Sequence, residues 1–261
     1  MTVLCSKSQP FNHNISAKSS GMGDATVAFN DHWSVFNNVG GISRTGSIVA
    51  LFSVYNRFNM QELSTVNAGL VYPMKGFTWG LTINRFGAQI HQQNQVGIAI
   101  GNTIQNTSLG VKINYLMSST EGYGSQGYLI TEVGSITELS PSIRIGLYVY
   151  NLNLAKFAES GGRRLPISFK SGLSYQPSAT FVLNIEIEKT LNHQPDTKIG
   201  LLYHVKKHIY LTTGIQTNPL NYNFGTGVNQ KRLEIGYALS GHTQLGLSHL
   251  LSISYKLKPE K

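Results

Sequence analysis

The sequence predicts an all-β protein in which about fourteen antiparallel strands close into a barrel. Three observations lead to this prediction. Apolar and polar residues alternate along most of the chain, glycine is frequent with 27 copies in 261 residues, and charged residues make up only 13%. Ordinary soluble domains contain about 25% charged residues. No apolar run reaches the roughly 18 residues of a membrane helix, so a bilayer would be crossed by strands.

The alternation defines the individual strands. Residues 77–84 place Phe77, Trp79, Leu81 and Ile83 on one face, and segments 109–115, 143–149, 181–188 and 233–239 repeat the pattern. Many strands have the 9–12 residues that a tilted crossing needs. In chain order, the strands are expected near residues 47–59, 63–73, 76–86, 94–104, 107–118, 126–138, 142–152, 166–176, 180–190, 197–205, 208–216, 221–229, 232–240 and 244–257.

Two closed sheets fit this alternation. A membrane barrel turns its apolar face outward to lipid, whereas a soluble sandwich or flattened barrel turns the same face inward. Loop lengths favour the membrane barrel, because outer-membrane barrels have short turns at one end and longer loops at the other. Tight turns are expected after even-numbered strands, as at Met74-Lys75 and Lys206-Lys207, and longer loops after odd-numbered strands, as at 87–94, 119–125, 153–165 and 191–196.

The chain divides into three parts. Residues 1–20 are expected to be a signal-peptide remnant and N-terminal extension, residues 21–43 a short helical hatch or plug segment, and residues 44–261 the barrel. Glycines such as Gly110 and Gly172 lie on the less apolar face of their strands. They leave space in the lumen for the hatch segment, or they only permit tight curvature.

The hatch segment carries a family resemblance. Its residues resemble the N-terminal signature of FadL-like outer-membrane barrels, a glycine-rich opening followed by Asp, an aromatic residue and Asn-Pro-Ala-Gly. This chain has Asn38-Val-Gly-Gly41, so the usual proline is absent and a looser turn is expected there. The residues that match are Gly21, Gly23, Asp24, Asp31, Trp33, Phe36, Asn38, Gly40 and Gly41.

The C-terminal half resembles one branch of these barrels, the PorV/PorQ family of Bacteroidota. The motifs are residues 165–177, 198–203, 214–219, 224–227 and 244–255. This resemblance implies an outer-membrane accessory protein of the type IX secretion system, which contacts the large translocon barrel or secreted cargo protein. Two alternatives remain open: a plug subunit that closes the translocon at the periplasmic face of the outer membrane, and a FadL-like transporter of a hydrophobic small molecule.

Other chemistry is not expected. The net charge is +9, but the basic residues form dispersed pairs such as Arg163-Arg164 and no stripe, which argues against nucleic acid. His204 and His208 span a predicted hairpin turn and therefore do not predict a metal site. Glu186 and Glu188 share a strand face, and Lys112, Arg144 or Lys170 is expected to balance them in the lumen. The sequence predicts no enzyme and no cofactor; the expected partners are proteins and outer-membrane lipid.

Overall fold

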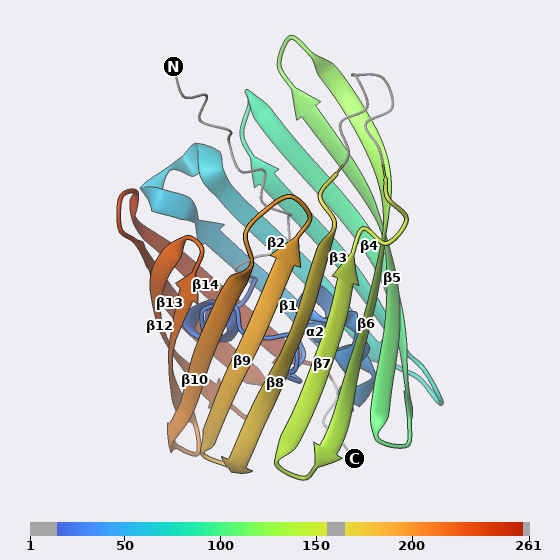
Figure 1. Ribbon diagram of the computed structural model, residues 1–261, viewed down its shortest axis with the longest axis vertical. Coiled ribbons are helices and arrows are strands. Elements are labelled where there is room, and N and C mark those ends of the chain that lie inside the picture. Colours follow the sequence, from blue (N-terminus) through green and yellow to red (C-terminus); the bar gives the residue numbers. More distant parts are fainter. Residues whose placement is uncertain (1–14, 156–164, 258–261) are drawn as a thin grey trace.

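The structure is a computed structural model that describes residues 15–155 and 165–257, and within them fourteen strands form a closed antiparallel barrel (Figure 1). Each strand pairs with its neighbours in sequence, and β1 pairs with β14 to close the sheet. The predicted fold class is therefore confirmed. The strands are β1 (Val49–Asn56), β2 (Ser64–Pro73), β3 (Thr78–Gly87), β4 (His91–Ile104), β5 (Thr107–Thr120), β6 (Gly124–Ser140), β7 (Ile143–Tyr150), β8 (Ser168–Ser178), β9 (Phe181–Thr190), β10 (Asp196–Lys206), β11 (Ile209–Thr217), β12 (Leu220–Gln230), β13 (Leu233–His242) and β14 (Gly246–Lys256).

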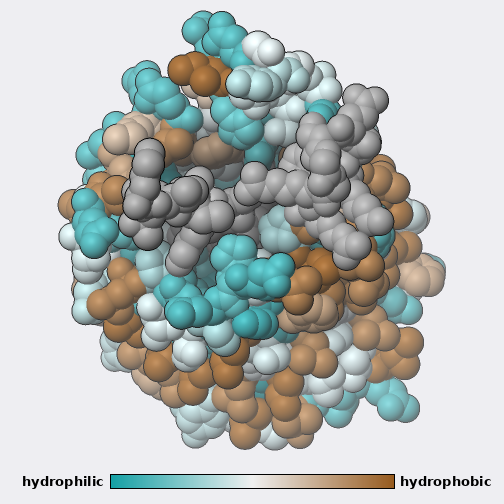
Figure 2. All heavy atoms as spheres, turned by 45° about the horizontal axis from the view of Figure 1, so that its top comes forward, coloured by the Kyte–Doolittle hydropathy of each residue, from teal (hydrophilic) through white to brown (hydrophobic). Residues whose placement is uncertain are grey.

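The barrel wall follows the alternation in the sequence. Along β3, Thr78 and Gly80 are buried in the lumen, whereas Trp79 and Leu81 are 43% and 42% exposed on the outside. The same outward direction holds for most large apolar side chains of the strands, and Figure 2 shows many of them gathered on the barrel wall. The soluble sandwich, in which these side chains would fill a dry centre, is excluded.

The connections differ between the two ends of the barrel. After even-numbered strands they are tight, as at 105–106, 141–142 and 207–208, and these turns lie at the bottom in Figure 1. After odd-numbered strands they include the segments 57–63 and 151–167. We call these ends the tight-turn end and the long-loop end. The tight turns expected after even-numbered strands are present, whereas only two of the four longer loops expected after odd-numbered strands are, at 151–167 and 191–195.

Strands β4, β5 and β6 are longer than the sequence predicts. They span 14, 14 and 17 residues and absorb most of the segments expected to be loops at 87–94 and 119–125. Residues there, such as Gln92, Gln93, Ser118 and Ser119, are polar, so the apolar alternation stops while the backbone ladder continues through them. Backbone pairing needs no apolar side chain, which is why the periodicity missed these extensions.

Residues 15–48, which we call the hatch, lie inside the barrel and are almost entirely buried. The hatch contains α1 (Ala17–Gly21), α2 (Ser34–Asn37) and the 3₁₀ helix η1 (Val39–Arg44); two further 3₁₀ turns, η2 (Arg57–Asn59) and η3 (Gln61–Leu63), join β1 to β2. Ser16 and Ser19 form a capping box that starts α1. The boundary predicted at Gly21 thus falls within α1, and residues 1–14 of the predicted extension lie outside the described residues. None of the helices in the described ranges is both long and apolar enough to cross a membrane.

Candidate functional site: the plugged lumen

The hatch winds along the inner wall, where glycines let its backbone approach the strands. A Cβ atom at Gly110 or Gly134 would lie 3.0 Å from the Gly40 nitrogen, and one at Gly40 would lie 2.6 Å from the Ser135 Cα atom. Met22 and Val27 make similar close approaches to wall glycines further around the barrel, Met22 at Gly200 and Gly214 and Val27 at Gly146 and Gly172. The glycines therefore accommodate the hatch, as only a residue without a Cβ permits such contact.

Asn38 joins two parts of the hatch to the wall. Its side-chain amide donates hydrogen bonds to the Val27 carbonyl at 2.5 Å and to the Ser135 carbonyl of β6 at 3.1 Å. Its side-chain oxygen accepts the Gly40 N–H at 3.0 Å, which caps η1. Three residues of the sequence motif, Asn38, Gly40 and Gly41, thus form one turn, and Gly41 packs against Ser34 of α2.

Trp33 and Phe36 form the apolar anchor of the hatch. Their ring centroids lie 6.0 Å apart. Both rings pack in a buried cluster with other hatch residues and with inward-facing side chains of β1, β2 and β4. Gly69 and Gly80 leave the room that Phe36 and Val35 occupy. This anchor fixes α2 against one side of the barrel.

Asp31 lies in the turn before α2, next to a partly buried histidine. Its carboxylate accepts the Trp33 N–H at 2.9 Å, and its own N–H donates to the Ser34 hydroxyl. Burial raises the pKa of Asp31 to about 6, against the opposing pull of Lys18. Burial also lowers the pKa of His32 to about 4, with further lowering by Lys256 and Lys18. Asp31 thus has a structural role in the turn that precedes α2 rather than that of a catalytic base.

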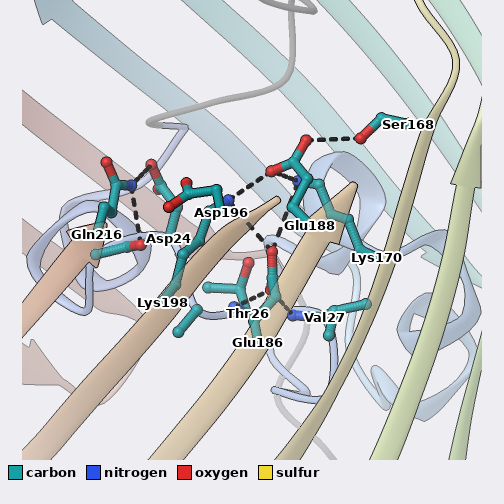
Figure 3. A network of polar contacts seen from close by, with 12 residues as sticks. Asp24, Thr26, Val27, Ser168, Lys170, Glu186, Glu188, Asp196, Lys198 and Gln216 are labelled. Atoms are coloured by element: carbon teal, nitrogen blue, oxygen red, sulfur yellow. Dashed lines mark hydrogen bonds and ion pairs between the residues drawn. The ribbon is translucent and has the colours of Figure 1, made fainter. Parts of the chain in front are cut away.

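A network of buried charges holds residues 26 and 27 of the hatch near the long-loop end (Figure 3). The Lys198 ammonium lies 2.6 Å from Glu188 and 3.3 Å from Glu186, and Lys170 lies 3.8 Å and 4.0 Å from the same two carboxylates. The second oxygen of Glu186 accepts the backbone N–H groups of Thr26 and Val27 at 2.8 Å and 2.7 Å. The carboxylate pair is therefore both neutralised by lysines and bonded to the hatch.

The sequence identified only part of this network. Lys170 balances the glutamates as expected, but Lys112 pairs with Glu132 and Arg144 donates to Gln176. Lys198 was missed. The signal that would have found it is the hairpin register, because Lys198 faces Glu186 across the β9–β10 ladder.

Neutral amides fasten the adjoining part of the hatch. Asn184 donates to the Ala25 carbonyl at 2.8 Å, and Gln216 donates to the Gly23 carbonyl at 2.9 Å and to the Asp24 carboxylate at 3.2 Å. Gly23 and Asp24 both have positive φ, so the chain turns sharply here. Gly21 lies against Thr212 and Gly225. All of the motif residues predicted from the sequence thus lie in the hatch and contact the wall or one another.

A separate ion pair holds α1 at the tight-turn end. The Lys18 ammonium lies 3.0 Å from Glu234 and 4.9 Å from the centroid of the Tyr210 ring. Burial alone lowers the pKa of Lys18, but the attraction of Glu234, Tyr210 and Asp31 outweighs it and the pKa is raised. Lys18 therefore stays charged, and charged contacts tie the hatch to the wall toward both ends of the barrel.

Apolar side chains form the inner wall of β5, β6 and β7 near the long-loop end. We call Leu116, Tyr128, Ile130, Tyr148 and Tyr150 the aromatic arc; they are buried in one cluster with Val27 of the hatch. Lys170 lies 5.7 Å from the centroid of the Tyr148 ring, so the charged network and the aromatic arc adjoin. Val27 is the hatch residue at which the two meet.

Metal ligation finds no support in the parts of the chain that the structure describes, where no group of three His, Cys, Asp or Glu side chains is placed to hold an ion. His204 lies on β10 with its ring 6.3 Å from that of Tyr210, and His208 lies in the turn after it, bonded to the Asn229 carbonyl. The spacing of these histidines reflects a hairpin.

No known family model and no curated protein matches the sequence. Solved structures do match the fold. A structure described as the CymD monoaromatic hydrocarbon channel aligns with a TM-score of 0.72 and 10% identity over 97% of this chain and 100% of that chain. The P. putida toluene transporter TodX aligns with a TM-score of 0.69 and 11% identity over 94% and 99%. The chain therefore has the fold of the FadL-like barrels, with its N-terminal segment held in the lumen.

Proposed function

We propose that the protein is an outer-membrane channel for small hydrophobic molecules and that the hatch is its gate. One observation carries this proposal: the aromatic arc, an apolar surface inside the lumen, contacts Val27 at the point where Glu186 holds the hatch. The described functions of the two similar structures, a monoaromatic hydrocarbon channel and a toluene transporter, agree with a ligand of this kind.

The outer wall supports a place in a membrane. Large apolar side chains are exposed around the barrel, for example Leu147 at 54% and Ile113 at 50%. Water would be a poor solvent for so much apolar surface, whereas lipid is a good one. The short and long loop sets at opposite ends fit an orientation with the tight turns in the periplasm.

The charged network suggests how the gate opens. A ligand that enters from the long-loop end and binds the aromatic arc competes with Val27 for the same surface. When Thr26 and Val27 leave, Glu186 loses two hydrogen bonds but keeps Lys198 and Lys170 beside it. An unpaired buried carboxylate would be very costly, and the two lysines prevent that cost. Release of the hatch is therefore feasible without displacement of the network itself.

The type IX accessory role remains a prediction from sequence resemblance. It requires a protein partner on the outer wall or loops and makes no use of the aromatic arc. The two functions therefore differ in where substitutions act, because changes inside the lumen affect a channel and leave an accessory role intact.

A reversible cross-link tests the gate. The Ser20 and Ser240 hydroxyls lie 3.4 Å apart between α1 and β13, so Ser20→Cys with Ser240→Cys places two thiols within reach of a disulfide. The background is Cys5→Ser, since Cys5 is the only native cysteine. We expect the reduced protein in liposomes to increase toluene flux, the oxidised protein to lose that increase, and reductant to restore it.

The matched control cross-links two wall strands. The Thr107 and Thr137 hydroxyls lie 3.1 Å apart across β5 and β6, away from α1. Oxidation of the Thr107→Cys, Thr137→Cys protein is expected to leave toluene flux unchanged. No toluene flux in the reduced proteins, or equal flux in oxidised and reduced Ser20→Cys, Ser240→Cys protein, contradicts the proposed gate.

A further inference from the structure

A row of amide side chains crosses the inner wall beside the aromatic arc. Ser53, Asn67, Asn84 and Gln95 are direct cross-strand partners on β1, β2, β3 and β4. All four side chains are buried, and Asn114 of β5, also buried, continues the row. We call Asn67, Asn84, Gln95 and Asn114 the amide row.

The hydrogen bonds in the row all run in defined directions. Asn67 donates to the Ser53 hydroxyl at 3.0 Å, Asn84 donates to the Asn67 oxygen at 2.7 Å, and Asn114 donates to the Glu132 carboxylate at 2.7 Å. A carboxylate accepts and does not donate, so the amide of Asn114 can have only one orientation. Its NH₂ group is used, and its oxygen faces away from Glu132.

Three acceptors are left over. Among the residues that the structure describes, the side-chain oxygens of Asn84, Gln95 and Asn114 have no hydrogen-bond donor. A buried oxygen without a donor destabilises a protein, so single cases are uncommon. Three neighbouring oxygens of this kind on one wall point to a donor that binds there.

The amide row passes a glycine on β4. Gly97 pairs directly with Asn114 across β4 and β5, and Gln95 lies two residues away on the same face of β4. A Cβ atom at Gly97 would lie 2.2 Å from the Asn114 side-chain oxygen and 2.7 Å from both the Lys112 Cε atom and the Thr82 hydroxyl oxygen. Gly97 thus leaves the room that these side chains occupy, and the Asn114 oxygen lies over the Gly97 backbone.

The amide row adjoins the aromatic arc through the strand register. Gln95 is the direct partner of Leu116, and Asn114 is the direct partner of Ile130, so acceptor oxygens and apolar side chains are neighbours on one surface. A molecule that lies on the arc therefore has the amide row at its edge.

Charge decides the class of donor. The ammonium of Lys112 lies 3.8 Å from the Glu132 carboxylate, so this region already holds an ion pair without net charge. It therefore attracts neither a cation nor an anion, and three acceptor oxygens disfavour an anion further. A neutral hydroxyl or amine suits all of these groups.

We propose that the lumen binds small aromatic molecules that carry a neutral hydrogen-bond donor, such as phenols. The ring lies on the aromatic arc, and the donor bonds to the oxygens of Gln95, Asn84 and Asn114. This inference rests on the proposed channel function and narrows its ligand, from any small hydrophobic molecule to one with a polar end.

Direct binding tests the inference with two molecules that differ by one hydroxyl, p-cresol and toluene. The detergent-purified full chain is equilibrated with each radiolabelled compound. We expect the protein to bind p-cresol about three- to tenfold more tightly than toluene, as for one to two net hydrogen bonds. In Gln95→Met, which keeps the size of the side chain and removes its oxygen, p-cresol binding weakens about three- to tenfold and toluene binding does not change.

The control is Gln61→Met, at an exposed position in η3, which leaves both affinities unchanged. Toluene binding by Gln95→Met shows in the same sample that the variant is folded. Equal affinities for the two compounds in the unaltered protein, or an unchanged ratio in Gln95→Met, overturn this inference, because water then satisfies the oxygens. Binding of neither compound overturns the channel function itself.

Discussion

Asp31 and His32 are neighbours in the hatch, and both have displaced pKa values. The two displacements make stability depend on pH in opposite directions. The pKa of Asp31 is raised from 3.8 to about 6, so its contribution to stability is present below 3.8 and is lost as pH rises through 6. The pKa of His32 is lowered from 6.5 to about 4, so its contribution is present above 6.5 and is lost as pH falls through 4. Between these limits the two effects offset each other.

Single substitutions separate the two residues. In Asp31→Asn the effect of His32 is no longer offset, so the stability of this variant is expected to fall as pH is lowered from 6.5 to 4. In His32→Gln the effect of Asp31 is no longer offset, so the stability of this variant is expected to fall as pH is raised from 3.8 to 6. The measurement is the urea midpoint in detergent across this range. Parallel pH profiles for both variants and the unaltered protein would contradict these assignments.

The sequence predicted which residues belong to the site better than it predicted the contacts between them. Asn38, Gly40 and Trp33 were found because they belong to one short motif, in which neighbours in sequence are also neighbours in space. Lys198 was missed because its partners Glu186 and Glu188 lie on another strand, and its role depends on the register of the β9–β10 hairpin. The side-chain oxygen of Gln95 lacks a donor because of how five neighbouring strands are arranged, and a local sequence pattern does not contain this information.

The hatch is an element whose stability comes from the wall rather than from its own helices. Helices α1 and α2 have five and four residues, too few to be stable alone. They persist because the capping box of Ser16, the apolar anchor of Trp33 and Phe36, and the bonds to Glu186 hold them in place. The hatch is therefore expected to respond strongly to changes in the fit between it and the strands.

Gly40→Ala tests this fit. The added Cβ would lie 2.6 Å from backbone atoms of Ser135, which cannot yield as a flexible side chain would, so η1 must lift from β6. We expect a loss of about 1–3 kcal/mol in the free energy of unfolding, as for an overpacked core, and higher ion conductance in planar bilayers.

Gly241→Ala is the matched control. Its added Cβ would lie 3.6 Å from the nearest atom, in Leu247, and Gly241 does not have a positive φ. Its free energy of unfolding and its conductance are expected to stay close to those of the unaltered protein. Equal effects of the two substitutions would show that the wall does not hold η1 tightly.

Strands were the part of the fold that the sequence predicted best. Period-two alternation places most strand ends within a few residues, because one face of each strand meets an apolar environment and the other does not. The extensions of β4, β5 and β6 escaped prediction since Gln92 and Ser119 there are both polar while the ladder continues. The lumenal path of the hatch was expected only in outline, and its contacts with Gly110 and Gly146 became visible only in the closed barrel.

The whole molecule has the surface of a protein that crosses a bilayer. Its outer wall also carries an apolar groove of about 440 Å³ over β3, β4, β5 and β6. In a membrane, acyl chains fill such a groove and no water is trapped in it. The groove is lined by Trp79, Val96, Ile98, Ala99, Ile100, Val111, Ile113, Tyr115 and Leu129.

A charged side chain on this wall is expected to lower the free energy of unfolding more at the middle of a strand than at its end. Ile113 lies midway along β5 and Leu109 lies near the tight-turn end, and their exposures are similar at 50% and 47%. Ile113→Arg is expected to lower the free energy of unfolding by about 2–4 kcal/mol and Leu109→Arg by about 0–1 kcal/mol. Urea unfolding in lipid bilayers measures both, and equal costs would contradict a lipid-facing wall.

The hatch runs directly into β1, the strand that seals the sheet against β14. The Leu257 N–H bonds to the Ile48 carbonyl just before the first pair of that ladder, so the last residue of the hatch is itself part of the seam. During biogenesis, residues 15–48 must consequently enter the barrel before β1 and β14 pair. If these strands paired first, the hatch would remain outside the lumen, so the order of the assembly steps matters as much as the final contacts.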